Sequence, residues 1–161
     1  NRYGAEVKMI YFIADTHFGD NRIIEYENRP FLHKQHMNDF MIYTWNATVQ
    51  DDDIVFHLGD VGDICPDVFK SLRGKKILIK GNHDTYPNEY YRNCGFKEAI
   101  DYPILFDFFL LSHEPLLLNE TTPYFNFYGH VHNDSKFIDN ATSKCVSVER
   151  IGYRPFCFLE R

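Results

Sequence analysis

The feature that most constrains this chain is a repeated arrangement of short apolar runs, each followed by a small polar cluster. The apolar runs are rich in β-branched and aromatic residues and have the length of strands. They are MIYFIA (9–14), DIVFHL (53–58), KKILIK (75–80), ILFDFFLL (104–111), YFNFY (124–128), KCVSVE (144–149) and PFCFLE (155–160). We expect these runs to form β-strands, so the fold is built around β-sheet.

Helices are expected between the strands of the first half. In QHMNDFMIYTWNATV (35–49), Met37, Met41 and Trp45 recur at helical spacing, which predicts a helix of several turns. A shorter helix is predicted to begin at Pro66 and to stop at Gly74. Strands alternate with helices in the first half and follow one another in the second. This order predicts a single α/β domain over residues 1–161, with a mixed sheet or two packed sheets.

Charge limits the partners of this domain. The formal net charge is −6 at pH 7, whereas a surface that coats phosphate backbones needs a basic face. Nucleic acid is therefore a disfavoured partner, although it is not excluded. Any phosphate group must be drawn to a local positive site.

The cellular setting is predicted from cysteines and hydropathy. The cysteines at 65, 94, 145 and 157 show no CxxC spacing, so a reduced, cytoplasmic protein is expected. No apolar run approaches the roughly 20 residues of a membrane span, and no signal peptide is evident at the start. Residues 1–8 precede Met9 and are expected to be an added remnant or a processed or disordered end. The oligomeric state is not encoded in any pattern of the sequence.

Polar clusters follow five of the expected strands. They are ADTHFGD (14–20), HLGD (57–60), GNHD (81–84), SHEP (112–115) and YGHVH (128–132). In open α/β sheets, ligands bind at such strand ends.

Each cluster alone has an ordinary structural explanation. Asp15 and His17 lie two residues apart, so both can point to one side as metal ligands, but a turn with a surface histidine gives the same triplet. Asp60 favours a cation beside a buried strand, or it is an N-cap or turn carboxylate. A lone His113 is more often a hydrogen-bonded core histidine. His130 and His132, which share one face after Gly129, are a stronger metal signal.

Taken together, the clusters have the order DxH, GD, GNHD, H and GHxH over residues 15–132. This order resembles the signature of the calcineurin-like metallophosphoesterase superfamily. The segments DTHFG, NRII and ENRPF also resemble the small phage and bacterial phosphoesterases of that superfamily. Many of those have histidine where this chain has Asp20, which leaves the role of Asp20 open.

The resemblance implies a four-layer α/β/β/α sandwich of two mostly mixed β-sheets flanked by helices, with two divalent metal ions at the strand ends. The implied ligands are Asp15, His17, Asp60 and His132 for one ion, and Asp60, Asn82, His113 and His130 for the other. Oxygen and imidazole ligands without thiolate suit Mn, Fe, Zn, Co or Ni better than Ca, and Mn is the ion that we expect. The two ions supply the local attraction for phosphate.

The activity implied by the resemblance is hydrolysis of phosphodiesters or small phosphoesters. A metal-bridging hydroxide attacks phosphorus, and His83 donates a proton to the leaving group. Asp84 either orients the His83 ring or caps the following segment. A phosphomonoesterase or a nucleotide-polyphosphate hydrolase of the same superfamily is the alternative. A protein-binding scaffold is a different class, and His83 argues against it because such scaffolds lack the general acid. A nuclease is disfavoured by the acidic charge.

Three neighbours of the motifs are candidate substrate contacts. Arg22 and Arg29 either bind substrate phosphate or are surface residues. Phe18, like Tyr86, either stacks on a base or aryl group or belongs to the core.

Other polar residues near the motifs are expected to have structural roles. His57 supports a metal ligand from beneath the site. His33 and His36 lie on a solvated helix face, and Asp63 is a turn carboxylate.

Overall fold

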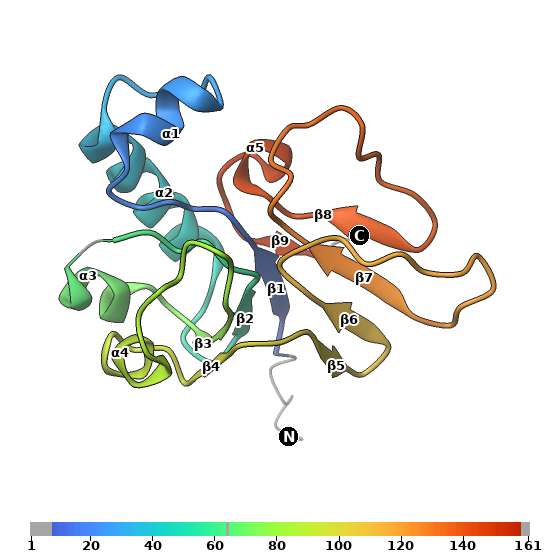
Figure 1. Cartoon of the computed structure of the whole chain (residues 1–161). Helices are drawn as coiled ribbons and strands as arrows, with labels where there is room; N and C mark the ends of the chain where they lie inside the picture. Colours follow the sequence, from blue (N-terminus) through green and yellow to red (C-terminus); the bar gives the residue numbers. More distant parts are fainter. Residues whose placement is uncertain (1–7, 64, 159–161) are drawn as a thin grey trace, which may run out of the picture.

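The computed structural model describes residues 8–63 and 65–158, so the predicted added end lies, apart from Lys8, outside the described residues. Two β-sheets pack against each other (Figure 1). The first has the order β4-β3-β2-β1-β9, with β1 to β4 parallel and β9 antiparallel to β1. Its strands are β1 (Ile10–Ile13), β2 (Ile54–His57), β3 (Lys75–Ile79), β4 (Glu98–Ile100) and β9 (Phe156–Cys157).

The second sheet has the order β5-β6-β7-β8. Its strands are β5 (Ile104–Phe106), β6 (Phe109–Leu111), β7 (Phe125–Tyr128) and β8 (Ser143–Cys145). β5 and β6 are antiparallel, whereas β6, β7 and β8 are parallel, so both sheets are mixed. The predicted α/β sandwich with two mixed sheets is therefore confirmed.

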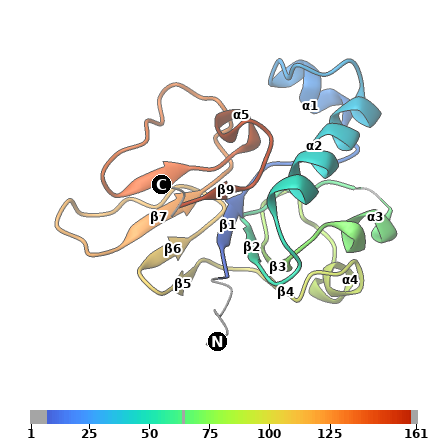
Figure 2. The same cartoon turned by 180° about the vertical axis from the view of Figure 1, so that it is seen from behind.

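The helices lie on one side of the first sheet. They are α1 (Asn21–Tyr26), α2 (Lys34–Thr48), α3 (Pro66–Ser71) and α4 (Asn88–Asn93). Figures 1 and 2 show these four on the side away from the second sheet. The single-turn α5 (Val148–Ile151) joins the same helix-side core through Val148. Among the described residues, the outer face of the second sheet has loops in place of helices, and they cover Tyr128, which is buried.

Alternate residues of the central strands serve two separate cores, because successive side chains of a strand point to opposite faces. Tyr11, Val55 and Leu78 pack against the helices. Phe12 and Phe127 are fully buried between the sheets, with ring centroids 4.1 Å apart. Burying a side chain of this size contributes about 1.5–3 kcal/mol.

Most predicted elements are present, with changed ends. α2 matches the predicted helix at 35–49 within one residue, while α3 ends at Ser71, before the predicted stop. The run at 104–111 is not one strand but the hairpin β5–β6, because Asp107 adopts a positive φ of 56° at the turn. The run at 144–149 ends as a strand at Cys145 and continues into α5. Residues 159 and 160 of the last predicted strand lie outside the described residues.

In the described part of the chain, none of the helices combines the length and the apolar character of a membrane span. All four cysteines lie in this part and are free, with Cys65 exposed and the other three buried.

Candidate metal centre

The polar clusters meet at one edge of the sandwich, where loops follow β1, β2 and β3 of the first sheet and β6 and β7 of the second (Figure 1). Five of the predicted ligands have left-handed backbone conformations. They are Asp15 (φ 58°), His17 (45°), Asp60 (57°), His130 (68°) and His132 (49°). Such conformations cost of order 1–3 kcal/mol each outside glycine, and they concentrate at functional sites. The backbone itself therefore marks this edge as a site.

Four ligand atoms converge on the side of Asn82. His113 Nε2 lies 3.0 Å from Asn82 Oδ1, 3.2 Å from His130 Nδ1 and 3.4 Å from Asp60 Oδ2. His130 Nδ1 lies 3.2 Å from Asn82 Oδ1. Ligands held about 2.1 Å from one ion lie roughly 3.0–3.4 Å from each other. The spacing of these four atoms thus fits a single metal ion.

The orientation of His113 leaves its Nε2 free for this group. Its Nδ1 donates to the carbonyl of Leu58 at 2.7 Å. A Cβ on Gly59 would collide with the His113 ring, so only glycine permits this approach. Burial lowers the pKa of His113, but the hydrogen bond to Asp60 and the charge of Asp15 prevail and raise it. The carboxylates therefore create a demand for positive charge at this point.

A second group consists of Asp15, His17 and His132, with Asp60 beside it. His17 Nε2 lies 3.6 Å from Asp60 Oδ2, and His132 Nε2 lies 3.9 Å from Asp15 Oδ1. Asp15 Oδ1 and His17 Nε2 are buried, and neither has a hydrogen-bond partner among the described residues. Buried polar atoms without partners are costly, and a cation between them would satisfy both. Because Asp60 Oδ2 faces both groups, it has the position of a shared ligand.

Burial acts on the charged forms of this second group. It raises the pKa of Asp15 to about 6 and lowers the pKa of His17 to about 4. Without a cation, both side chains are thus pushed toward their neutral forms. A divalent ion would favour the charged carboxylate of Asp15 instead. It would also require the neutral imidazole that His17 already favours.

Ser147 fixes the orientation of Asp15, a role that was not predicted. Its hydroxyl donates to Asp15 Oδ2 at 2.5 Å, and the backbone N–H of His130 donates to the same oxygen at 2.8 Å. The other oxygen, Oδ1, is left facing the second group of ligands. Ser147 lies 132 positions along the chain from Asp15, so no local pattern could reveal the contact.

Arg29 is buried and does not have the predicted substrate role. Its guanidinium lies 2.6 Å from Glu149 Oε1 and donates to the carbonyls of Asp15 (2.6 Å) and Thr16 (2.9 Å). Glu149 Oε1 also lies 3.0 Å from His132 Nδ1. Burial lowers the pKa of His132, but the hydrogen bond with Glu149 outweighs it and raises the pKa. Arg29 and Glu149 thus hold the loops of the predicted ligands Asp15 and His132 from inside the protein.

Phe18 also lacks its predicted role in substrate stacking. Its side chain is buried, and its ring packs edge-on against Phe69 with centroids 5.8 Å apart.

Arg22 is exposed and lies 3.4 Å from Asp20. Asp20 accepts a hydrogen bond from the Arg22 N–H and is the N-cap of α1, which gives this residue a structural role. Substrate contact by Arg22 stays a prediction.

Asp84 organises the backbone and does not orient the His83 ring. Its two oxygens accept hydrogen bonds from the N–H groups of Asp60, Val61 and Gly81 at 2.7–2.9 Å. The carboxylate therefore joins the loop after β2 to the turn after β3. The predicted orienting role is wrong, and so is the alternative of a cap on the following segment. The His83 ring is exposed at the margin of the centre, 5.6 Å from the His17 ring between centroids.

His57 supports the site from beneath, as predicted. Its Nδ1 accepts the Gly59 N–H at 3.2 Å, so its Nε2 donates to Thr16 Oγ1 at 2.9 Å, and the threonine hydroxyl donates to the carbonyl of Val61. Burial lowers the pKa of His57 to about 3. The neutral ring therefore links the loops that contain Asp15 and Asp60.

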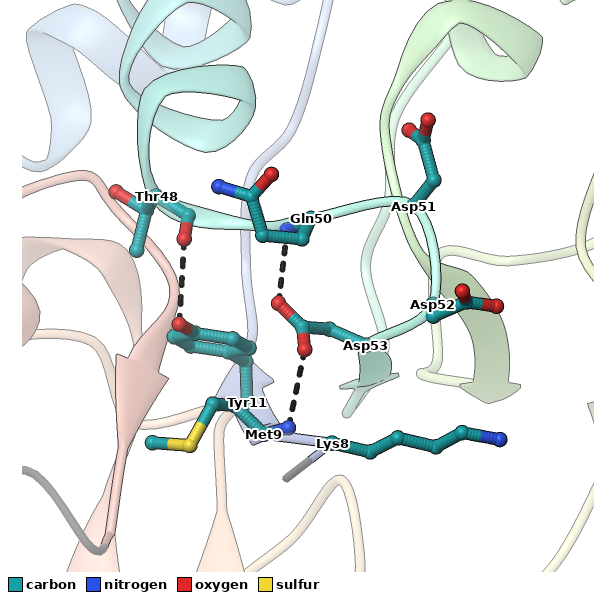
Figure 3. A pocket seen from close by; sticks show the side chains of 8 residues that line it. All are labelled: Lys8, Met9, Tyr11, Thr48, Gln50, Asp51, Asp52 and Asp53. Atoms are coloured by element: carbon teal, nitrogen blue, oxygen red, sulfur yellow. Dashed lines mark hydrogen bonds between the residues drawn. The ribbon is translucent and has the colours of Figure 1, made fainter. Parts of the chain in front are cut away.

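Cavities adjoin the centre on two sides. One of about 480 Å³ is lined by His130 and His132, and one of about 340 Å³ is lined by Asn82 and His113. A cavity of about 590 Å³ lies at the opposite ends of β1 and β2 (Figure 3). There, Asp53 accepts hydrogen bonds from the N–H groups of Met9 and Gln50. Asp53 belongs to the turn that starts β2, so this cavity is remote from the predicted metal ligands.

Comparison with known proteins places the chain in a family. No protein-family model matches it. The uncharacterized protein MJ1445 of Methanocaldococcus jannaschii is 33% identical to it, over 92% of this chain and 86% of that protein. The chain belongs to the MJ1445 family. This assignment rests on sequence over nearly the whole chain.

Two solved structures share the fold of this MJ1445-family chain. AQ665 of Aquifex aeolicus, a protein of unknown function, matches with a TM-score of 0.74 and 24% identity over 93% of this chain and 95% of that one. Nuclease MPE of Pseudomonas putida matches with a TM-score of 0.55 and 20% identity over 76% of this chain and 61% of its own length. Both likenesses concern the fold. Within that fold, the MJ1445-family chain gathers carboxylates and histidines in groups that could bind metal ions.

Proposed function

We propose that this protein is a metal-dependent phosphoric ester hydrolase of the calcineurin-like metallophosphoesterase superfamily, acting on phosphodiesters or small phosphoesters. One observation carries the proposal: two groups of ligand atoms lie side by side and share Asp60 Oδ2, which is 3.6 Å from His17 Nε2 and 3.4 Å from His113 Nε2. A carboxylate shared in this way is typical of two-metal sites that hydrolyse phosphoesters. The fold shared with a nuclease adds support for a hydrolase.

The residues of the chain would hold two divalent ions, with Mn as our first expectation. Asp15, His17, Asp60 and His132 would hold one; Asp60, Asn82, His113 and His130 would hold the other. When bound, such ions supply a hydroxide nucleophile at neutral pH and neutralise the charge of the phosphate. Arg29 cannot neutralise the phosphate in place of the ions, because its guanidinium is buried and paired with Glu149.

His83 would donate the proton that the leaving oxygen needs. Its backbone N–H donates to Asp60 Oδ1 at 2.9 Å, which fixes the residue next to the shared carboxylate. Its imidazole is exposed at the margin of the centre, where an ester oxygen can reach it. A histidine is suited to this task because its imidazole can donate a proton to a leaving oxygen within hydrogen-bond reach.

The test combines metal analysis of the purified protein with a screen of phosphate esters in added Mn. Hydrolysis that is lost with a chelator and restored by Mn is the expected result. Preference for aryl phosphodiesters over the matched monoesters supports diesterase activity, and the reverse preference indicates the phosphomonoesterase or nucleotide-polyphosphate hydrolase alternative. Single- and double-stranded DNA belong in the same screen, because a fold neighbour is a nuclease. A protein that binds no metal and cleaves no ester would be a scaffold.

A further inference from the structure

The cavity of about 340 Å³ beside Asn82 and His113 is formed where both sheets end. Its wall includes the turn after β3, the segment of residues 101–103 that crosses from β4 to β5, and the residues that follow β6. A cavity of about 150 Å³ is enough to bind benzene. An aryl-sized group therefore fits here while its phosphate lies at the metal ligands.

The one lysine of the described cavity lining, Lys80, is already paired with Asp101. Lys80 Nζ lies 3.0 Å from each of Asp101 Oδ1, Asn88 Oδ1 and the carbonyl of Tyr86, so its three N–H donors are all used. The other oxygen of Asp101 accepts from the Asn88 amide at 2.8 Å. Glu114, also in the lining, is exposed and adds negative charge. The described lining thus offers no free cation for a second phosphate group.

Away from the metal ligands, part of the lining is apolar and includes an exposed aromatic ring. Tyr102 is 68% exposed, and Pro103 and Leu116 belong to the same lining. A lining that contains an aromatic ring and two aliphatic side chains suits an uncharged planar or apolar group.

His83 is not among the described residues that line the cavity. The cavity is lined by Asn82 and His113, whereas the ring of His83 lies near His17. A leaving group that takes its proton from His83 therefore lies elsewhere. A phosphodiester has a second organic substituent that can fill this space, whereas a phosphomonoester does not.

Resting on the proposed function, we propose that this cavity binds the non-leaving organic substituent of a phosphodiester, and that this substituent is uncharged and aromatic or apolar. The cavity then favours diesters over monoesters, which lack such a group. It disfavours substrates with a second phosphate, such as nucleotide polyphosphates.

The test keeps the leaving group constant and varies only the second substituent. The Mn-loaded protein is assayed with para-nitrophenyl esters whose second substituent is methyl, phenyl or para-carboxyphenyl. We expect kcat/KM to be about tenfold higher for phenyl than for methyl, and lower for para-carboxyphenyl than for phenyl. Because para-nitrophenolate leaves in each case, the differences report the second substituent alone.

Two pairs of variants locate the effect. Tyr102→Ala should reduce the phenyl-to-methyl ratio to near one, while Tyr43→Ala, which removes a tyrosine of similar exposure on α2, should leave the ratio unchanged. Glu114→Gln should improve the para-carboxyphenyl ester about threefold over wild type. Glu120→Gln, which removes an exposed acid outside the cavity lining, should leave that ester unchanged.

Binding without turnover gives an independent measurement. Diphenylphosphinate and dimethylphosphinate have no ester bond, so calorimetry can compare their affinities. Tighter binding of the diphenyl anion, lost in Tyr102→Ala, supports the proposal. Suppose that the methyl diester is hydrolysed but kcat/KM is no higher for the phenyl diester, or that Tyr102→Ala keeps the preference for the phenyl diester. The cavity proposal is then overturned and the proposed function stands. If no ester is hydrolysed by the metal-loaded protein, both are overturned.

Discussion

Glu149 joins a predicted metal ligand to a buried arginine through a single oxygen. Its Oε1 lies 3.0 Å from His132 Nδ1 and 2.6 Å from the Arg29 guanidinium. A carboxylate on Nδ1 keeps the proton on that nitrogen and leaves Nε2 free to bind a metal. Glu149, which is not itself a predicted ligand, therefore prepares His132 Nε2 to bind a metal ion.

Replacing Glu149 by Gln should weaken metal binding. The amide keeps the size of the side chain but removes the charge that holds both His132 and Arg29. We expect Mn affinity to fall about 10- to 100-fold, measured by calorimetry. Glu120→Gln, an exposed change, is the control. A lower melting temperature with unchanged Mn affinity would show that Glu149 only stabilises the fold.

Removing the imidazole of His83 should slow turnover without loss of metal. For His83→Ala, kcat should fall about 10²- to 10⁴-fold with alkyl leaving groups, which need a proton. The loss should be smaller with para-nitrophenolate, which leaves unprotonated. His36→Ala, at an exposed histidine on α2, is the control. Equal losses for both leaving groups would argue against a proton donor.

His57 should make the fold sensitive to acid. Its folded pKa of about 3 lies below the ordinary 6.5, so the unfolded chain binds the extra proton between these values. Its contribution to stability is complete above about pH 6.5 and is lost as pH falls toward 3. In His57→Gln, where the amide still donates to Thr16, the free energy of unfolding should depend less on pH, by up to about 1.4 kcal/mol per unit. Urea titrations at several pH values measure this, and parallel curves for both proteins would contradict it.

At the scale of elements, β1 and β7 bring ligand loops from different sheets together. Their contact depends on Phe12 and Phe127, which stack with centroids 4.1 Å apart and are fully buried. Phe127→Ala should destabilise the protein by about 3–5 kcal/mol because it leaves a cavity between the sheets. Phe127→Leu should destabilise the protein clearly less than Phe127→Ala. Chemical denaturation measures both, and equal losses would mean that the cavity does not dominate.

The sequence predicts long or strongly patterned elements well and short ones poorly. α2 has fifteen residues with a clear apolar stripe, so it could be predicted. α1 and α4 have six residues each and β4 has three, which is too few to show a period, and they were missed. The hairpin in ILFDFFLL was missed because its turn is Asp107 and Phe108, without glycine or proline.

The candidate site also has residues that the sequence predicts well and residues that it does not. Asp15, His17, Asp60, Asn82, His113, His130 and His132 could be predicted because they occupy strand ends in short motifs, and the structure brings them together. The roles of Ser147 and Glu149 could not, because their partners lie more than a hundred residues away or across the fold. The roles of Arg29 and Phe18 were wrong because proximity in sequence does not report burial.

At the scale of the whole molecule, the candidate metal centre is divided between the sheets, so ligand binding should stabilise the entire fold. Mn present at about 100 times its Kd should add about 2.7 kcal/mol to the free energy of unfolding. Calorimetric melting with Mn and with chelator measures this. Asp60→Asn, which removes the shared charge, should abolish most of the shift, and an unchanged melting temperature in wild type would contradict metal binding.

The division between the sheets also sets an order in time. Asp15, His17, Asp60 and Asn82 lie in the first hundred residues, whereas His113, His130 and His132 follow β5. A chain emerging from the ribosome therefore has four of the seven ligands long before the rest. β9, the last strand, pairs with β1, the first. If the protein binds metal as proposed, the ions would be captured late in biosynthesis, because a nascent chain stopped near residue 100 would lack ligands of both groups.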